Sequence, residues 1–309
     1  MERLLITLIL VCTMSNITNA QNPFYGQYHT PHGTVPFDRI ETEHYEPAIL
    51  EGIKLQNAEI EAIIQNPEKA DFSNTIEAFE ASGELLDKVV AVFGNMLSAE
   101  TNDDLQELAQ KIMPLLSEHS NNITLNEKLF ARVKEVYNQK ETLQLTQEQK
   151  QLLENAYNSF VRHGANLEGE AREEYRRLTN ELSKLTLTFS ENNLKETNAY
   201  QMLLTKKESL AGLPEIIIEA AAETAKSEEK EGWAFTLHAP SYVPFMTYSD
   251  NRDLRQKLYM AYNTKCTHDN EFNNIDIVKN IANTRMKIAQ LLGYKDYAEY
   301  TLKKRMAEN

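Results

Sequence analysis

The feature that most constrains the fold is an apolar spacing of three and four residues that recurs along much of the chain. Between residues 175 and 189 the apolar side chains step by 3, 4, 3 and 4 positions, which places them on one face of a helix. The same spacing recurs over residues 76–97, 105–116, 129–137 and 152–161. It predicts antiparallel helices packed as a bundle; a dimeric coiled coil is the alternative, but the repeat is short for one.

The scarcity of turn-forming residues supports a helical fold. The chain has 10 glycines and 9 prolines in 309 residues, well below the usual shares of about 7% and about 5%. A β-sandwich, a β-barrel or a glycine-rich nucleotide-binding fold needs more of them. We therefore predict a mainly α protein.

Several helix ends can be assigned from local signals. Asn74 with Glu77, and Thr146 with Gln149, have the spacing of capping boxes that begin helices. The apolar residues after Asn74 are expected to form one continuous face as far as residue 97. Gly164 is expected to end the helix that begins near Thr146.

The two ends of the chain carry further signals. Residues 22–47 contain four prolines, ending with Pro47, and are expected to be extended because each proline would interrupt a helix.

Pro114 predicts a kink in a later helix. Gly293 is a natural stop. A last helix is expected from Asp296 to the final residue, Asn309, with apolar side chains that have no later partner.

A short strand-containing insertion is expected near residues 200–240. Residues 200–205 and 233–237 have the composition of strands and bracket a helix near 215–226. Helix returns after Asp250. The chain is accordingly divided into a signal peptide (1–20), an extended segment with the first helix (21–70), a helical bundle lobe (71–198), and an α/β excursion that leads into a following helical region (199–309).

The first twenty residues have the pattern of a secretory signal peptide. Arg3 precedes an apolar stretch that reaches Cys12, and polar residues then lead to Ala20. We expect cleavage after Ala20 and export to the periplasm, with no membrane attachment afterwards. The alternatives are a buried N-terminal helix and a lipoprotein anchored at Cys12, although Val11 does not suit a lipoprotein signal. After cleavage only Cys266 remains, so no internal disulfide can form.

The net charge excludes one class of partner. The chain carries 46 acidic and 32 basic residues, a net charge of −14, and no lysine- or arginine-rich block offsets it. Because this sign repels phosphate backbones, nucleic acid is not expected as a partner.

Motifs for a self-contained active site are absent from the sequence. It has no G-x-G-x-x-G, no P-loop, no G-x-S-x-G and no H-E-x-x-H. Of the histidines only His29 and His32 have a spacing that binds metal on a helix, and Pro31 lies between them. Cys266 and His268 are interpreted as bystanders. We therefore assign no catalytic, cofactor-binding or metal-binding residue to this chain.

A series of short segments nevertheless resembles a known family in number, order and spacing. The matching segments are PFDRI (36–40), HYEPA (44–48), FSNTIEA (72–78), SGELL (82–86), AETN (99–102), LNEKLF (125–130), FVRHGA (160–165), LAGLP (210–214), NRDLR (251–255) and residues 289–306. Together they resemble the N-terminal half of the zinc metallopeptidases that include peptidyl-dipeptidase Dcp, oligopeptidase A and thimet oligopeptidase. The resemblance is closest to the peptidyl-dipeptidase branch.

The resemblance implies a fold and an activity. It implies a multi-helix lobe of a zincin-like, two-lobed oligopeptidase with a deep channel that admits short peptides and excludes folded proteins. In that family zinc is held by the two histidines of H-E-x-x-H and a downstream glutamate, and peptidyl-dipeptidases release dipeptides from the C-terminus of the substrate. All of these residues would belong to a C-terminal catalytic half that this chain lacks.

Two hypotheses follow for the chain itself. The first is the channel-forming N-terminal part of a secreted zinc metallopeptidase, truncated before the catalytic motif, inactive alone and without zinc of its own. The second is a non-catalytic helical protein that binds peptides or other partners.

Overall fold

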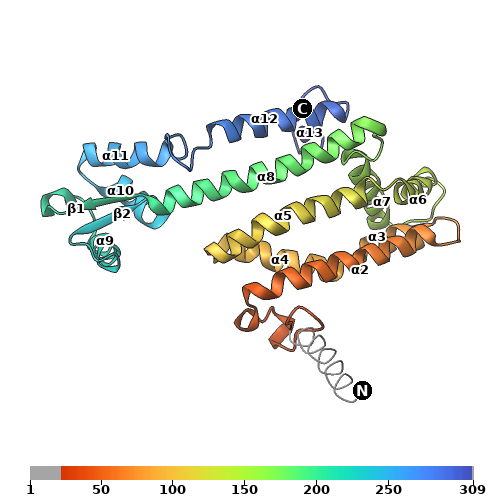
Figure 1. Ribbon diagram of the computed structural model, residues 1–309, viewed down its shortest axis with the longest axis horizontal. Coiled ribbons are helices and arrows are strands. Elements are labelled where there is room, and N and C mark those ends of the chain that lie inside the picture. Colours follow the sequence, from red (N-terminus) through yellow and green to blue (C-terminus); the bar gives the residue numbers. More distant parts are fainter. Residues whose placement is uncertain (1–21, 308–309) are drawn as a thin grey trace, which may run out of the picture. The chain divides into compact units, whose positions relative to one another are not determined.

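The computed structural model describes residues 22–307. The expected signal peptide, its cleavage site at Ala20, and Cys12 therefore lie outside the described residues. The described chain is mainly α-helical with one two-stranded sheet, which confirms the predicted fold class (Figure 1). In the described part of the chain, no helix is long and apolar enough to cross a membrane.

The chain divides into two compact units. Of the described residues, unit 1 contains 22–180 and 288–307, and unit 2 contains 181–287. Both boundaries fall inside helices, whereas the division made from the sequence separates residues 71–198 from 199–309. The two units are described separately below.

Unit 1 is built almost entirely from helices. They are α2 (Tyr45–Gln65), α3 (Ala78–Glu80), α4 (Glu84–Ala99), α5 (Asp103–Thr124), α6 (Glu127–Asn138), α7 (Gln147–Arg162), the first part of α8 (Gly169–Ala199), the end of α12 (Ile275–Leu291) and α13 (Tyr297–Leu302). Figure 1 shows α2, α4 and α5 running side by side.

The core of unit 1 gathers around Phe160 of α7, which is 1% exposed. Its ring lies 5.3 Å from that of Phe79 and 5.8 Å from that of Phe130 on α6, measured between ring centroids. Val133 and Val136 of α6 are fully buried in the same cluster. Burial of each such side chain contributes about 1.5–3 kcal/mol, so the apolar faces predicted from the spacing are what hold these helices together.

A glycine sets the distance between α2 and α4. A Cβ atom at Gly52 of α2 would lie 2.9 Å from the Cα of Leu86 on α4, closer than real Cβ atoms approach. The absence of a side chain at Gly52 therefore allows the two backbones to touch.

The N-terminal segment contains no α-helix between residues 22 and 44, in line with its prolines, but it is not extended throughout, and it ends earlier than predicted. Residues 22–44 contain three short 3₁₀ turns, Pro31–Gly33, Phe37–Arg39 and Thr42–His44, and α2 begins at Tyr45. Pro47 does not interrupt the helix because it lies in the first turn, where a backbone N–H has no partner within the helix.

The capping box predicted for Asn74 and Glu77 is wrong. Asn74 is instead the N3 residue of a capping box whose N-cap is Asp71: the Asp71 carboxylate accepts from the Asn74 backbone N–H at 2.7 Å, and the Asn74 side chain accepts from the Asp71 N–H at 3.0 Å. This box begins a π-helical turn, η4 (Phe72–Glu77), which leads into α3.

The continuous apolar face predicted from residue 76 to residue 97 is also wrong. A turn at Ser82 and Gly83 separates α3 from α4, and Gly83 has φ +85°, which favours glycine. The Gly83 N–H donates to the Glu59 carboxylate at 2.8 Å. This bond to α2 fixes the turn, and the apolar spacing continues on a new helix.

Other predicted helix ends are confirmed. Thr146 and Gln149 form both bonds of a capping box at the start of α7, and Gly164 follows its end with φ +87°. Gly293 likewise follows α12 with φ +83°. Helix α5 continues through Pro114.

Unit 2 contains the predicted insertion. Its elements are the last part of α8, β1 (Gln201–Leu204), α9 (Glu215–Ser227), β2 (Trp233–Thr236), α10 (Ala239–Tyr248), α11 (Arg252–Asn263) and most of α12. The two strands pair antiparallel, with Met202 opposite Phe235, so the predicted strands and the helix between them are confirmed.

Helix α10 was not among the helices predicted from the sequence, and it contains two prolines, Pro240 and Pro244. Pro240 lies in the first turn, which tolerates proline. Phe245 is fully buried, and its ring meets that of Phe235 on β2 edge-on at 4.6 Å. Burial of Phe245 in the core of unit 2 outweighs the hydrogen bond that Pro244 cannot donate.

The last helix is shorter than predicted and does not lack contacts. Helix α13 ends at Leu302, and Lys303 N–H caps it by donating to the carbonyls of Glu299 and Thr301. The Arg162 guanidinium of α7 donates to the Tyr300 carbonyl at 2.8 Å and lies 4.1 Å from the centroid of the Tyr300 ring. These contacts hold α13 within unit 1.

A buried histidine makes unit 1 sensitive to acid. His119 is 6% exposed and its Nε2 lies 2.7 Å from Gln56 Oε1, while burial lowers its pKa below the ordinary 6.5. Above about pH 6.5 the ring is mostly neutral in the unfolded chain as well, so its protonation costs no stability. Below that pH the unfolded chain takes up a proton before the folded chain does, so stability falls.

The unfolding free energy should decline as the pH falls from 7 to 5. We expect His119→Gln to make this decline less steep, by no more than the slope that uptake of one proton on unfolding produces. Urea denaturation at several pH values, followed by circular dichroism, measures this. His163→Gln, which changes an exposed histidine at the end of α7, is the matched control. Equal slopes for His119→Gln and the unaltered chain would contradict the assignment.

Candidate functional site

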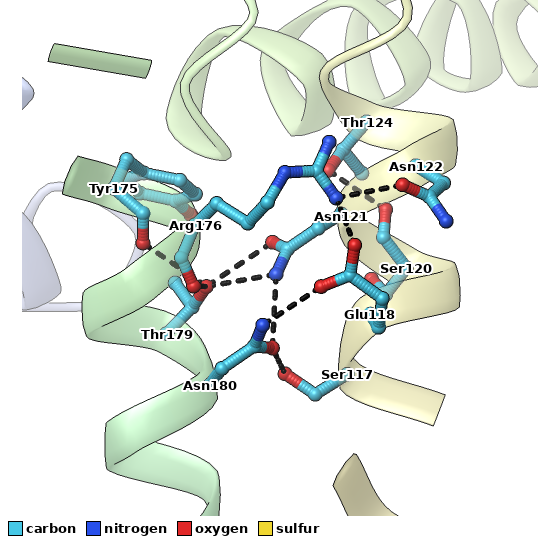
Figure 2. A network of polar contacts seen from close by, with 10 residues as sticks. All are labelled: Ser117, Glu118, Ser120, Asn121, Asn122, Thr124, Tyr175, Arg176, Thr179 and Asn180. Atoms are coloured by element: carbon cyan, nitrogen blue, oxygen red, sulfur yellow. Dashed lines mark hydrogen bonds and ion pairs between the residues drawn. The ribbon is translucent and has the colours of Figure 1, made fainter. Parts of the chain in front are cut away.

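A network of polar contacts in unit 1 joins α5 to the first part of α8 (Figure 2). On each helix the polar residues are spaced by one, three or four positions and so share a face. Helix α5 contributes Ser117, Glu118, Asn121 and Asn122, and α8 contributes Arg176, Thr179 and Asn180.

The Glu118 carboxylate lies at the centre of this network. Arg176 donates to its Oε1 at 2.5 Å, and Asn180 donates to its Oε2 at 2.7 Å. The same Arg176 nitrogen also reaches the side-chain oxygen of Asn122 at 2.6 Å. Two donors on α8 therefore share one anion on α5, an arrangement stronger than a bond between neutral groups.

Neutral side chains complete the network. Asn121, which is buried, donates to the Thr179 hydroxyl at 2.9 Å and to the side-chain oxygen of Asn180 at 3.3 Å. Ser117 donates to that same oxygen at 2.7 Å. Each buried polar group here has a partner, which is what burial requires.

The network can fix helices but is not equipped for catalysis. It contains no histidine, cysteine or lysine, and its only carboxylate is already paired with Arg176 and Asn180. A general base needs to be within reach of a substrate proton, and a nucleophile needs a base beside it. The arrangement therefore positions α8 against α5.

The histidines are dispersed in the fold, as they are in the sequence. They are His29, His32, His44, His119 and His163 in unit 1, and His238 and His268 in unit 2. Within residues 22–307 no three side chains of His, Cys, Asp or Glu come together as metal ligands. Catalytic zinc needs about three protein ligands, so the described residues do not fit a catalytic zinc ion.

Cys266 and His268 share a carboxylate in unit 2. Glu196 of α8 accepts from the Cys266 backbone N–H, and its Oε1 lies 3.8 Å from His268 Nε2. Burial, and then the contact with Glu196, raise the pKa of the Cys266 thiol to about 11. Since the thiolate is the nucleophilic form, this cysteine is poorly suited to catalysis.

Sequence reasoning missed the network between α5 and α8. The signal that could have found it is the pair of polar faces, one on each of two strongly periodic helices. What the sequence does not contain is the pairing itself, because Glu118 and Arg176 are 58 positions apart.

Comparison with known proteins shows that the chain is similar to peptidases. Residues 245–309 match the model of Peptidase family M3. Dipeptidyl carboxypeptidase of Escherichia coli (strain K12) is 35% identical over 288 residues, which cover 93% of this chain and 42% of that protein. Oligopeptidase A of Salmonella typhimurium (strain LT2) is 30% identical over 292 residues, which cover 93% of this chain and 42% of that protein.

The alignment with a plant protein covers similar shares of both chains. Probable cytosolic oligopeptidase A of Arabidopsis thaliana is 28% identical over 303 residues, which cover 95% of this chain and 42% of that protein. The chain therefore spans about two fifths of the length of these relatives.

We expect Arg176→Met to lower the unfolding free energy by about 1 kcal/mol, because the half-buried Arg176 guanidinium bonds both Glu118 and Asn122 across to α5. Arg177→Met is the matched control: Arg177 contacts Glu174 on an exposed face of the same helix, where such pairs contribute about 0.3–0.5 kcal/mol. Urea denaturation compares the two variants. Equal losses would show that the network does not stabilise the unit.

Proposed function

We propose that the chain forms the N-terminal lobe of a zinc metallopeptidase that hydrolyses short peptides, because residues 245–309 match Peptidase family M3 and 93% of the chain aligns with a dipeptidyl carboxypeptidase. The observation that carries this proposal is the 35% identity to a dipeptidyl carboxypeptidase across 93% of the chain. That relative favours release of dipeptides from the C-terminus of the substrate as the reaction. Peptides would thus be the substrates, and this chain would line their access channel.

The fold suits a structural part of such an enzyme. The helices of unit 1 are fixed by an apolar core and by the network around Glu118, and a wall that admits only narrow substrates has to be rigid. The zinc ligands and the general base would lie in the portion of the longer relatives that this chain does not cover. Zinc bound there would activate a water molecule for attack on the peptide bond.

Exposed apolar side chains suggest where that portion packs. Large apolar residues are exposed in the segment that matches the family model, and large exposed apolar patches mark interaction surfaces. In unit 2 they are Tyr248, Tyr259, Met260, Tyr262, Ile275, Val278 and Met286. We propose that the remainder of the peptidase covers part of this surface.

The proposal includes export. The signal-like segment that ends at Ala20 supports secretion to the periplasm, and the mature protein recovered there should begin at Gln21. N-terminal sequencing measures this; a lipid-modified start at Cys12 would contradict it.

The function can be tested by a chimera. Residues 22–307 of this chain replace the corresponding segment of the E. coli dipeptidyl carboxypeptidase. We expect the chimera to release C-terminal dipeptides from short blocked peptides, with kcat/KM within about 100-fold of the parent, a loss of about 2.7 kcal/mol in transition-state stabilisation.

Two controls complete that experiment. The parent enzyme with the segment deleted, and the 309-residue chain alone, should both be inactive, and the chain alone should bind no zinc stoichiometrically. A chimera that folds cooperatively and binds zinc but releases no dipeptide would contradict the proposal. It would instead favour a non-catalytic peptide-binding or interaction protein.

A further inference from the structure

Unit 2 contains a pocket of about 200 Å³ between α9, β2 and the first turn of α10. We propose that this pocket binds a leucine-sized apolar side chain of a peptide, with the hydroxyl of Ser241 donating to a carbonyl of that peptide. The choice of a peptide as the ligand rests on the proposed function. The pocket itself is described by residues of unit 2 alone.

The pocket exists because small residues face one another across it. On α9, Ala220, Ala221 and Thr224 share one face, since they are spaced by one, three and four positions. On β2, Ala234 faces them. Ile217 and Pro240 complete the apolar lining. A larger residue at any of the small positions would close the space, so the cavity is a consequence of sequence.

The polar rim is held in one arrangement. His238 Nε2 lies 3.0 Å from the side-chain oxygen of Asn198, and its Nδ1 lies 3.2 Å from the Thr236 hydroxyl. Because a carbonyl oxygen can only accept, Nε2 carries the proton and Nδ1 accepts from Thr236. The ring is therefore oriented before any ligand arrives.

Ser241 is the group left to bind a ligand. Its Oγ accepts from the Thr236 backbone N–H at 3.0 Å, and within residues 22–307 no acceptor is found for its own hydroxyl proton. A hydroxyl has one donor and two acceptor sites, so this donor remains available at the edge of the pocket. A peptide carbonyl would satisfy it.

Size and charge define the ligand. None of the nine lining residues is Asp, Glu, Lys or Arg, which favours an uncharged group. An apolar cavity of about 150 Å³ accommodates benzene, so a pocket of about 200 Å³ can take a leucine side chain. Ala220 and Pro240 are exposed, which gives the pocket a mouth at the surface.

The only tryptophan of the chain provides the readout, because Trp233 immediately precedes the lining residue Ala234. The 309-residue chain is titrated with acetyl-Ala-Leu-Ala-amide while Trp233 fluorescence is recorded. Acetyl-Ala-Asp-Ala-amide is the control peptide. We expect a saturable change with the leucine peptide and at least about tenfold weaker binding of the aspartate peptide, because burying its charge is costly.

Matched variants locate the site. Ala220→Phe fills the mouth of the pocket and should weaken binding of the leucine peptide at least about tenfold, since its volume replaces that of the ligand. Glu219→Phe places the same ring on the neighbouring exposed position, which does not line the pocket, and should bind as the unaltered chain does. If Ala220→Phe lowers the melting temperature, Thr224→Leu fills the same pocket one turn along α9.

Equal binding of the two peptides, no saturable change, or equal binding by the filled and control variants would overturn the proposal and leave the pocket a packing void. Because this titration uses neither zinc nor turnover, its failure would leave the chimera result intact. The pocket and the proposed function can thus fail separately.

Discussion

Burial of Phe160 is the interaction on which unit 1 most depends. Its ring contacts Phe79 and Phe130, so three segments that are distant in sequence meet at one side chain. The helices that carry Phe130 and Phe160, α6 and α7, have 12 and 16 residues. Isolated helices of that length are marginal in water, so the shared apolar core, more than helix propensity, keeps them formed.

Polar contacts fix the position of one helix along another, which apolar packing alone does not. An apolar face tolerates sliding of one helix along another, whereas the bonds that Arg176 and Asn180 make to Glu118 have a single geometry. Unit 2 contains a two-stranded sheet, and such a sheet is only marginally stable by itself. There Phe235 of β2 is buried with Phe245 of α10, so a helix stabilises the sheet.

The sequence predicted elements whose signals are local and missed those that depend on competition or distance. Thr146 and Gln149 begin α7 as predicted because no rival box overlaps them. Asn74 does not begin a helix because Asp71, three residues earlier, is the N-cap residue and accepts a hydrogen bond from the Asn74 backbone N–H. Helix α10 was missed, and it contains Pro244, whose cost is visible locally while the burial of Phe245 is not. The α5–α8 network, likewise, depends on a pairing across 58 positions.

We propose that this chain forms the N-terminal lobe of a zinc metallopeptidase, with the zinc ligands in the portion of its relatives that the chain does not cover. Reading the complete coding sequence from the transcript, beyond the codon for Asn309, tests this most directly. The account predicts an in-frame continuation that contains H-E-x-x-H. A stop codon directly after Asn309, together with the short protein as the expressed product, would contradict it.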